Sequence, residues 1–184
     1  MTSSEVIFIW YHLDMNNWRV TKYDPKLRNS RGAFEGDDWI MMSDIGSVFN
    51  GKPLTLEEYL KTEDRYITVL HKQLRASNVP YLCVKQLQKP IVEATTKDLA
   101  DKHSLYEKTD LEEGQQLEIK EALRIVRLIL REFVWCKLEF DNRFYVHIGW
   151  DYYMYVGTTL KDSEFVMSLK DSGLYAEHFE SPYK

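Results

Sequence analysis

Residues 135–158 read WCKLEFDNRFYVHIGWDYYMYVGT, and this stretch decides the fold. It is dense in aromatic and β-branched residues, which favour strands, and short breaks interrupt it at 141–143 and 149–151. Three-residue loops at both breaks predict an antiparallel meander of three strands. The first strand pair then sets Phe140 opposite Phe144, Leu138 opposite Val146, and Cys136 opposite Ile148.

The second strand pair follows the same pattern, with Ile148 opposite Tyr152, Val146 opposite Met154, and Phe144 opposite Val156. Because side chains alternate across a strand, these residues share one apolar face, which we expect to be the core face. A slip of one residue would mix the two faces, so the pattern supports this register. The other face, here called the tyrosine face, carries Lys137, Glu139, Tyr145, His147, Tyr153 and Tyr155.

The totals fit a single globular domain over residues 1–184. Hydrophobic residues make up 44% of the chain and charged residues 29%, which is an ordinary globular balance. The net charge of −5 argues against a general nucleic-acid binder, which would show a basic stripe. It fits a protein that meets a basic partner, although mild acidity is also common among soluble proteins.

The cysteines and the N-terminal segment indicate a cytoplasmic protein. Cys83 and Cys136 both lie in predicted apolar strands, which favours two buried thiols over a disulfide or a metal site. The N-terminal apolar run, residues 6–11, is too short for a signal peptide and lacks a basic flank. No apolar run approaches the length that a membrane span needs.

Two long helices are predicted outside the meander. Thr55 and Glu58 have capping-box spacing before an apolar stripe at helical intervals, and this helix should end before Pro80. Thr109 and Glu112 repeat the spacing, which predicts a second helix over 111–133. A chain of this kind is α+β, with a mainly antiparallel sheet that contains the meander and packs against two long helices.

Shorter elements complete the prediction. We expect strands at 5–13, 18–23 and 81–87, and a short helix from Ser43 or Asp44 to Phe49, with a stop signal over 50–53. Another short helix should begin at Asp162 or Ser163 and run through Leu169, and the tail could form a last strand. Residues 24–38 read as a long polar surface loop, a kind of segment that often binds partners.

No catalytic or cofactor motif is present in the sequence. The five histidines form no HxH, HExxH or Cys/His cluster, which argues against a metal site, and no phosphate-binding or nucleophile motif occurs. His147 is the best candidate for acid–base chemistry, since it shares a sheet face with Lys137 and Tyr153. The simpler interpretation is a hydrogen-bonded, half-buried histidine, so an enzyme is less favoured than a binding protein.

Two surfaces carry more acids or aromatics than folding requires. One is the end of the 24–38 loop, with Asp37, Asp38 and Trp39, where the acids could steer a basic partner. The other is the tyrosine face, where Tyr145, His147, Tyr153 and Tyr155 could provide contact area at low entropic cost. Alternatively, a helix or the C-terminal segment covers that face.

The residues from Trp18 to Ile67 resemble a pattern found in toxin-immunity proteins of bacterial competition systems. The pattern is a strand that ends in Tyr23-Asp24-Pro25, a Gly-containing loop, Asp37-x-Trp39, and Ser43-Asp44-Ile45-Gly46. A helix follows that begins Leu-Thr-x-x-Glu-Tyr-Leu at residues 54–60. Met41 and Met42 depart from the pattern, which usually has polar residues there.

This resemblance implies a small, acidic, cytoplasmic bacterial protein that inhibits a partner toxin domain by occluding its active site. It implies no catalytic residue, cofactor or metal. The alternative is a small cytoplasmic enzyme or nucleotide-processing protein that uses the His147 side of the sheet, and a structural subunit of a larger complex is a third possibility.

Overall fold

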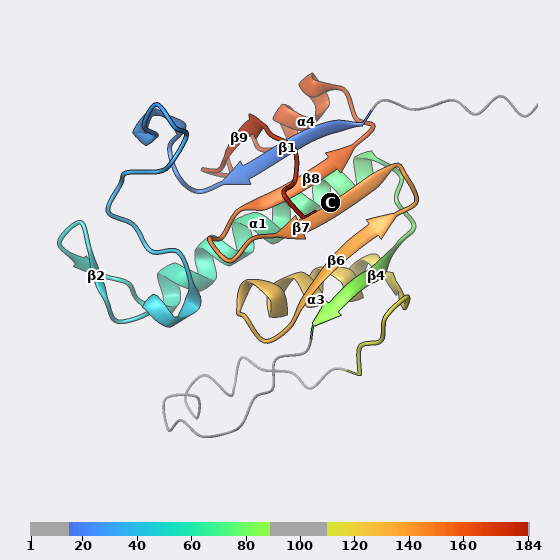
Figure 1. The fold of residues 1–184 in the computed structure, drawn as a ribbon, viewed down its shortest axis with the longest axis horizontal. Helices are drawn as coiled ribbons and strands as arrows, with labels where there is room; N and C mark the ends of the chain where they lie inside the picture. The colour runs from blue at the N-terminus through green and yellow to red at the C-terminus, as the bar shows by residue number, and fades with distance from the viewer. Residues whose placement is uncertain (1–14, 89–109, 184) are drawn as a thin grey trace, which may run out of the picture.

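The structure, a computed structural model, describes residues 15–88 and 110–183. The strand predicted at 5–13 lies outside these residues. The described chain forms a seven-stranded antiparallel sheet in the order β5-β4-β6-β7-β8-β1-β9, which confirms the α+β class (Figure 1). The strands are β1 Asn16–Thr21, β4 Tyr81–Gln88, β5 Gln116–Glu118, β6 Trp135–Phe140, β7 Phe144–Ile148, β8 Met154–Thr158 and β9 Tyr175–His178. The last of these confirms the strand predicted in the tail.

The meander forms as predicted, but its second hairpin has a different register. In the first hairpin, Leu138 pairs with Val146 as expected. In the second, Val146 pairs with Val156 instead of Met154, because the loop spans 149–153 and not three residues. The shift is by two residues, so every side chain keeps its face, and Leu138, Val146 and Met154 are buried together in the core.

The first long helix begins where its cap predicts. Helix α1, Leu56–Ala76, starts after Thr55, whose hydroxyl accepts a hydrogen bond of 3.1 Å from the backbone N–H of Glu58. A capping threonine satisfies one of the backbone N–H groups that the first turn leaves without a partner.

The second long helix is shorter than predicted. Helix α3, Ile119–Leu130, begins at Ile119 and not at 111. Residues 111–118 instead contain a turn at Gly114, whose φ is +79°, and the edge strand β5. Pairing with β4 sets Leu117 opposite Leu82 and buries Leu117, so tertiary pairing overrides the local helical pattern.

The short helix predicted over 43–49 is wrong. Residues 42–44 form a single 3-10 turn, η2 Met42–Asp44, and a two-stranded hairpin follows, β2 Val48–Phe49 and β3 Lys52–Pro53. Asn50 and Gly51 join the two strands with φ of +48° and +75°. An Asn-Gly pair at positive φ is the strongest short hairpin signal, so the stop signal predicted over 50–53 is a hairpin turn.

The helices lie on one face of the sheet, where the main core forms. Figure 1 shows α1 and α3 behind the strands, and the short helix α4, Asp162–Ser168, packs at the β1 side. Trp18 of β1 stacks on Phe165 of α4 with ring centroids 4.6 Å apart. The opposite face of the sheet is the tyrosine face. No α-helix covers it in the described residues, so it can be covered by another segment or bind a partner.

Candidate interaction surface

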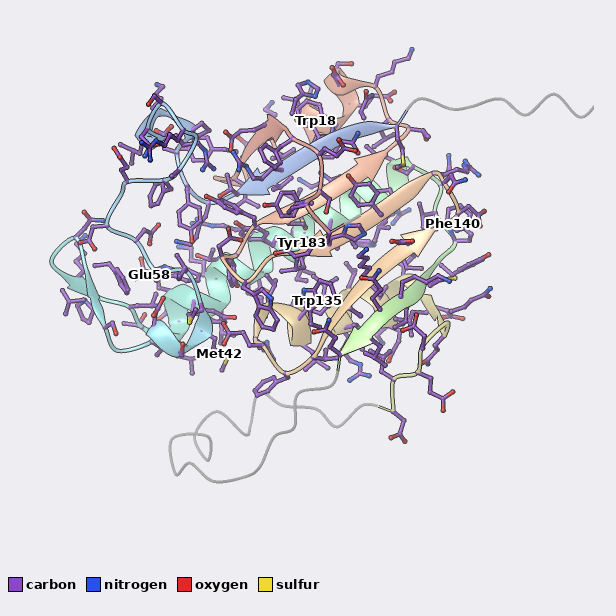
Figure 2. All side chains as sticks on the ribbon, in the orientation of Figure 1. Trp18, Met42, Glu58, Trp135, Phe140 and Tyr183 are labelled. Atoms are coloured by element: carbon purple, nitrogen blue, oxygen red, sulfur yellow. The ribbon has the colours of Figure 1, made fainter. Side chains whose placement is uncertain are left out.

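The tyrosine face is covered in the structure. The C-terminal residues 179–183 cross it, and the figures show the chain end, with Tyr183, over the middle of the sheet (Figures 1 and 2). A second, smaller cluster of buried residues on this side consists of Tyr23, Tyr145, Tyr153 and Tyr155. Burial raises the pKa of Tyr145 and of Tyr155 to about 12. Of the two alternatives for this face, the structure has the one in which the C-terminal segment covers it.

The 24–38 loop also covers part of the tyrosine face, and Arg28 of this loop holds it there through a cluster of charged side chains. Arg28 donates to the Tyr153 hydroxyl over 2.9 Å and to the Glu177 carboxylate over 2.8 Å. Arg19 of β1 binds the same carboxylate at 3.2 Å. One carboxylate thus holds two guanidinium groups, and this cluster ties the loop to β1 and β9.

His147 is buried, and both of its ring nitrogens have hydrogen-bond partners. Its side chain is 2% exposed, its Nδ1 is 2.8 Å from the Ser181 hydroxyl, and its Nε2 is 3.2 Å from a Glu139 carboxylate oxygen. Tyr145 stacks on the imidazole at a centroid distance of 4.4 Å. His147 pairs across the strands with Tyr155, and not with Tyr153 as predicted, because of the register shift. The arrangement anchors the C-terminal segment to the sheet.

The three predicted residues at the end of the loop have different surroundings. Asp37 is exposed and accepts a hydrogen bond of 2.6 Å from the backbone N–H of Asn50. Asp38 is half-buried and forms an ion pair with Lys22. Trp39 is buried against Tyr59 and Tyr152, so it belongs to the core and not to a surface. Only Asp37 of the seven predicted binding residues is exposed.

Trp150 is the most exposed of the aromatic side chains in the described residues, and it was not among the predicted binding residues. Its side chain is 56% exposed, in the loop between β7 and β8. Ile40, 41% exposed, lines a small crevice together with Trp150 and Glu132. Asp44 lies beside Ile40, since its carboxylate accepts hydrogen bonds from the backbone N–H groups of Ile40 and Met41 at 2.9 and 3.2 Å. We give the name Trp150 patch to Trp150, Ile40, Glu132 and Asp44, together with the exposed Asp37, which precedes Ile40 by three residues in the chain.

A signal for Trp150 was present in the sequence. It stands in the break Gly149-Trp150-Asp151, where a turn requires small or polar residues and gives no reason for a tryptophan. An aromatic residue in a turn that the core does not need indicates a contact outside the fold.

The groove along α3 is a weaker candidate. It measures about 800 Å³, and its lining includes Lys120, Arg124, Arg127 and Arg131. The three arginines are engaged in ion pairs: Arg127 and Arg131 with the buried Glu63 at 2.6 and 2.7 Å, and Arg124 with Glu121 at 2.6 Å. The pairs with Glu63 join the α3 region to α1, and the three arginines all have an acidic partner, which leaves little net charge to attract a ligand.

Neither a metal-ligand cluster nor a disulfide is found among the described residues. Among residues 15–88 and 110–183, no group of three or more His, Cys, Asp or Glu side chains is arranged to hold a metal ion. Cys83 and Cys136 are free thiols, and burial raises the pKa of Cys136 to about 12, so it is a poor nucleophile. None of the helices in these ranges combines the length and the apolar character needed to span a bilayer.

No family model, curated protein or solved structure matches this chain.

Proposed function

We propose that this protein is an inhibitor of the immunity type, which binds a basic toxin domain and occludes its active site with the Trp150 patch. The observation that carries the proposal is the exposure of Trp150 beside Ile40, whose backbone N–H is bound by the Asp44 carboxylate. The exposed Asp37 precedes Ile40 by three residues in the chain. An apolar centre with an acidic rim is the composition expected of a surface that binds a basic protein.

The two kinds of residue in the patch would have separate roles. Trp150 would supply affinity, since tryptophan is enriched at hot spots where truncation costs roughly 2 kcal/mol or more. Asp37 and Asp44 would attract the basic rim of an active-site cleft and raise the association rate. The net charge of −5 acts in the same direction.

The patch is held by hydrogen bonds that would limit the entropy lost on binding. The Tyr23 hydroxyl lies 2.9 Å from the carbonyl oxygen of Trp39 and 3.2 Å from that of Asp151, so it links the two segments that carry Ile40 and Trp150. The Asp44 carboxylate fixes the backbone at Ile40. A surface that is already ordered binds more tightly than a mobile one.

Co-expression with the toxin domain encoded by a neighbouring gene tests the proposal. Wild-type protein should rescue growth, and Trp150→Ala should rescue poorly while melting at the wild-type temperature, because Trp150 is exposed. Met167→Ala is the matched control, since Met167 is 65% exposed on α4 and outside the patch. Full rescue by Trp150→Ala would place the interface elsewhere, and failure of the wild type to bind any neighbouring toxin domain would remove the inhibitor function.

The enzyme alternative has less support. His147 has a hydroxyl and a carboxylate within hydrogen-bond reach, as an acid–base residue would. Its side chain is nevertheless buried under the C-terminal segment and lines neither of the cavities described above. A substrate would have to displace residues 179–183 to reach it.

A further inference from the structure

Lys22 and Asp38 form an unusual pair beneath the 24–38 loop. The Lys22 Nζ lies 2.7 Å from the Asp38 Oδ2, and the side chains are 6% and 34% exposed. Despite this distance, the Nζ does not have the angles of a hydrogen bond and makes none with a described residue. The contact is therefore close without being a well-aligned salt bridge.

The surroundings of the Lys22 amine are aromatic. Its Nζ lies 4.0 Å from the ring centroid of Trp39 and 4.2 Å from that of Tyr23. Burial lowers the pKa of Lys22 to about 8, although Asp38 and Asp44 act in the opposite direction. A substantial share of neutral, nucleophilic amine is thus available near pH 8.

We propose that Lys22 and Asp38 form an intramolecular isopeptide bond, an amide between the Lys22 Nζ and the Asp38 Cγ. The Lys22 Nζ is 2.7 Å from the Asp38 Oδ2, and Cγ, the carbon that would react, is one bond from this oxygen. Holding two reacting groups this close replaces an encounter in solution by an intramolecular step. The aromatic rings restrict access of water to the amine, which favours condensation over solvation of the charged pair.

The reaction balances without any added reagent. Proton transfer from Nζ to Oδ2 converts the ion pair into a neutral amine and a carboxylic acid, which are the reactive forms. The Nζ lone pair then bonds to Cγ, the C–O bond breaks, and the oxygen leaves as water. Both hydrogens of this water come from the original ammonium group, so the pair loses one water molecule and no net proton.

The bond would close the loop that supports the proposed binding surface. Lys22 directly follows β1, and Asp38 immediately precedes Trp39 and Ile40. An amide between them would lock residues 23–37 into a covalent ring and fix the segment that holds Asp37 and Ile40. The proposal does not depend on the proposed function, since it rests on the Lys22–Asp38 contact and on the aromatic surroundings of Lys22.

Intact-mass measurement of the purified full chain, after incubation at pH 8, tests the bond. We expect a mass lower than the sequence mass by one water molecule. Tryptic digestion of the denatured protein should then fail to cleave after Lys22 but cleave after the exposed Lys26, and it should yield a peptide that joins the Lys22 and Asp38 segments. Full sequence mass together with normal cleavage after Lys22 would overturn the proposal.

Matched variants exclude other dehydrations. Lys22→Arg keeps the charge but not the nucleophilic amine, and Asp38→Ala removes the electrophile, so both should show their full mass. Asp37→Ala changes the neighbouring carboxylate and should still lose water. Loss of water from Lys22→Arg would contradict the proposal, because it would show a dehydration at another position. Thermal melting of each variant confirms that it folds.

Discussion

Glu63 of α1 has no exposed side-chain surface, and its carboxylate binds two arginines, Arg127 in α3 and Arg131 just after it. Its oxygens lie 2.6 Å from Arg127 Nη1 and 2.7 Å from Arg131 Nε. Glu63→Gln should lower the free energy of unfolding by about 3 kcal/mol, because it leaves two partly buried cations without their common anion. Urea denaturation measures this value.

Asp64→Asn is the control. Asp64 contacts Arg127 at 2.8 Å but is exposed, so this substitution should lower the free energy of unfolding by less than about 1 kcal/mol. Equal effects of the two substitutions would contradict the interpretation.

The buried tyrosines predict the behaviour of the protein in alkali. Tyr145 and Tyr155 have pKa values raised to about 12 by burial, whereas tyrosines in the unfolded chain ionise near pH 10. The unfolded state therefore loses protons first, so this stabilisation is fully present below pH 10 and is lost as the pH rises from about 10 to 12. Urea denaturation at increasing pH should show this loss, and Tyr155→Phe should reduce its slope. An unchanged slope in that variant would show that Tyr155 is not protected in the folded state.

At the scale of elements, Gly157 and Tyr145 fix how β7 and β8 fit together. The two residues pair directly, and the Tyr145 ring covers the glycine so closely that an added Cβ would lie 2.0 Å from a ring carbon. An aromatic ring over a glycine is a known way to stabilise a glycine in a sheet. The pair also explains why position 157 accommodates no side chain.

Gly157→Ala should therefore lower the free energy of unfolding by about 1–3 kcal/mol through overpacking. In the Tyr145→Ala background, the same substitution should cost much less, because the ring that clashes is absent. A double-mutant cycle measured by urea denaturation gives the coupling between the two positions. Additive effects would show that the Tyr145 ring does not lie over Gly157.

At the scale of the whole molecule, the fold was more predictable than the surface. The meander could be predicted because alternation fixes the face of each side chain, and even the two-residue register shift left every face unchanged. The start of α3 was not predictable from its local pattern, because Leu117 is recruited into the sheet by Leu82, far away in the sequence. The hairpin at Asn50-Gly51 was predictable and was overlooked.

The exposure of the candidate site could not be predicted from one sequence. Whether Tyr153 and His147 face solvent depends on Arg28 in one loop and Ser181 near the C-terminus, which reach the same sheet face from opposite ends of the chain. The same long-range packing buries Trp39 and leaves Trp150 outside. A local pattern shows that aromatic residues are in excess, and only the tertiary structure shows which of them are exposed.

The binding kinetics of the protein with its candidate toxin domain test the central claim most directly. Trp150→Ala should speed dissociation at least about tenfold, which corresponds to roughly 1.4 kcal/mol or more, with little change in association. Asp37→Asn should instead slow association and weaken its dependence on salt, because it removes a steering charge. Met167→Ala should match the wild type in both rates. Wild-type dissociation of Trp150→Ala would contradict the assignment of the binding surface to the Trp150 patch.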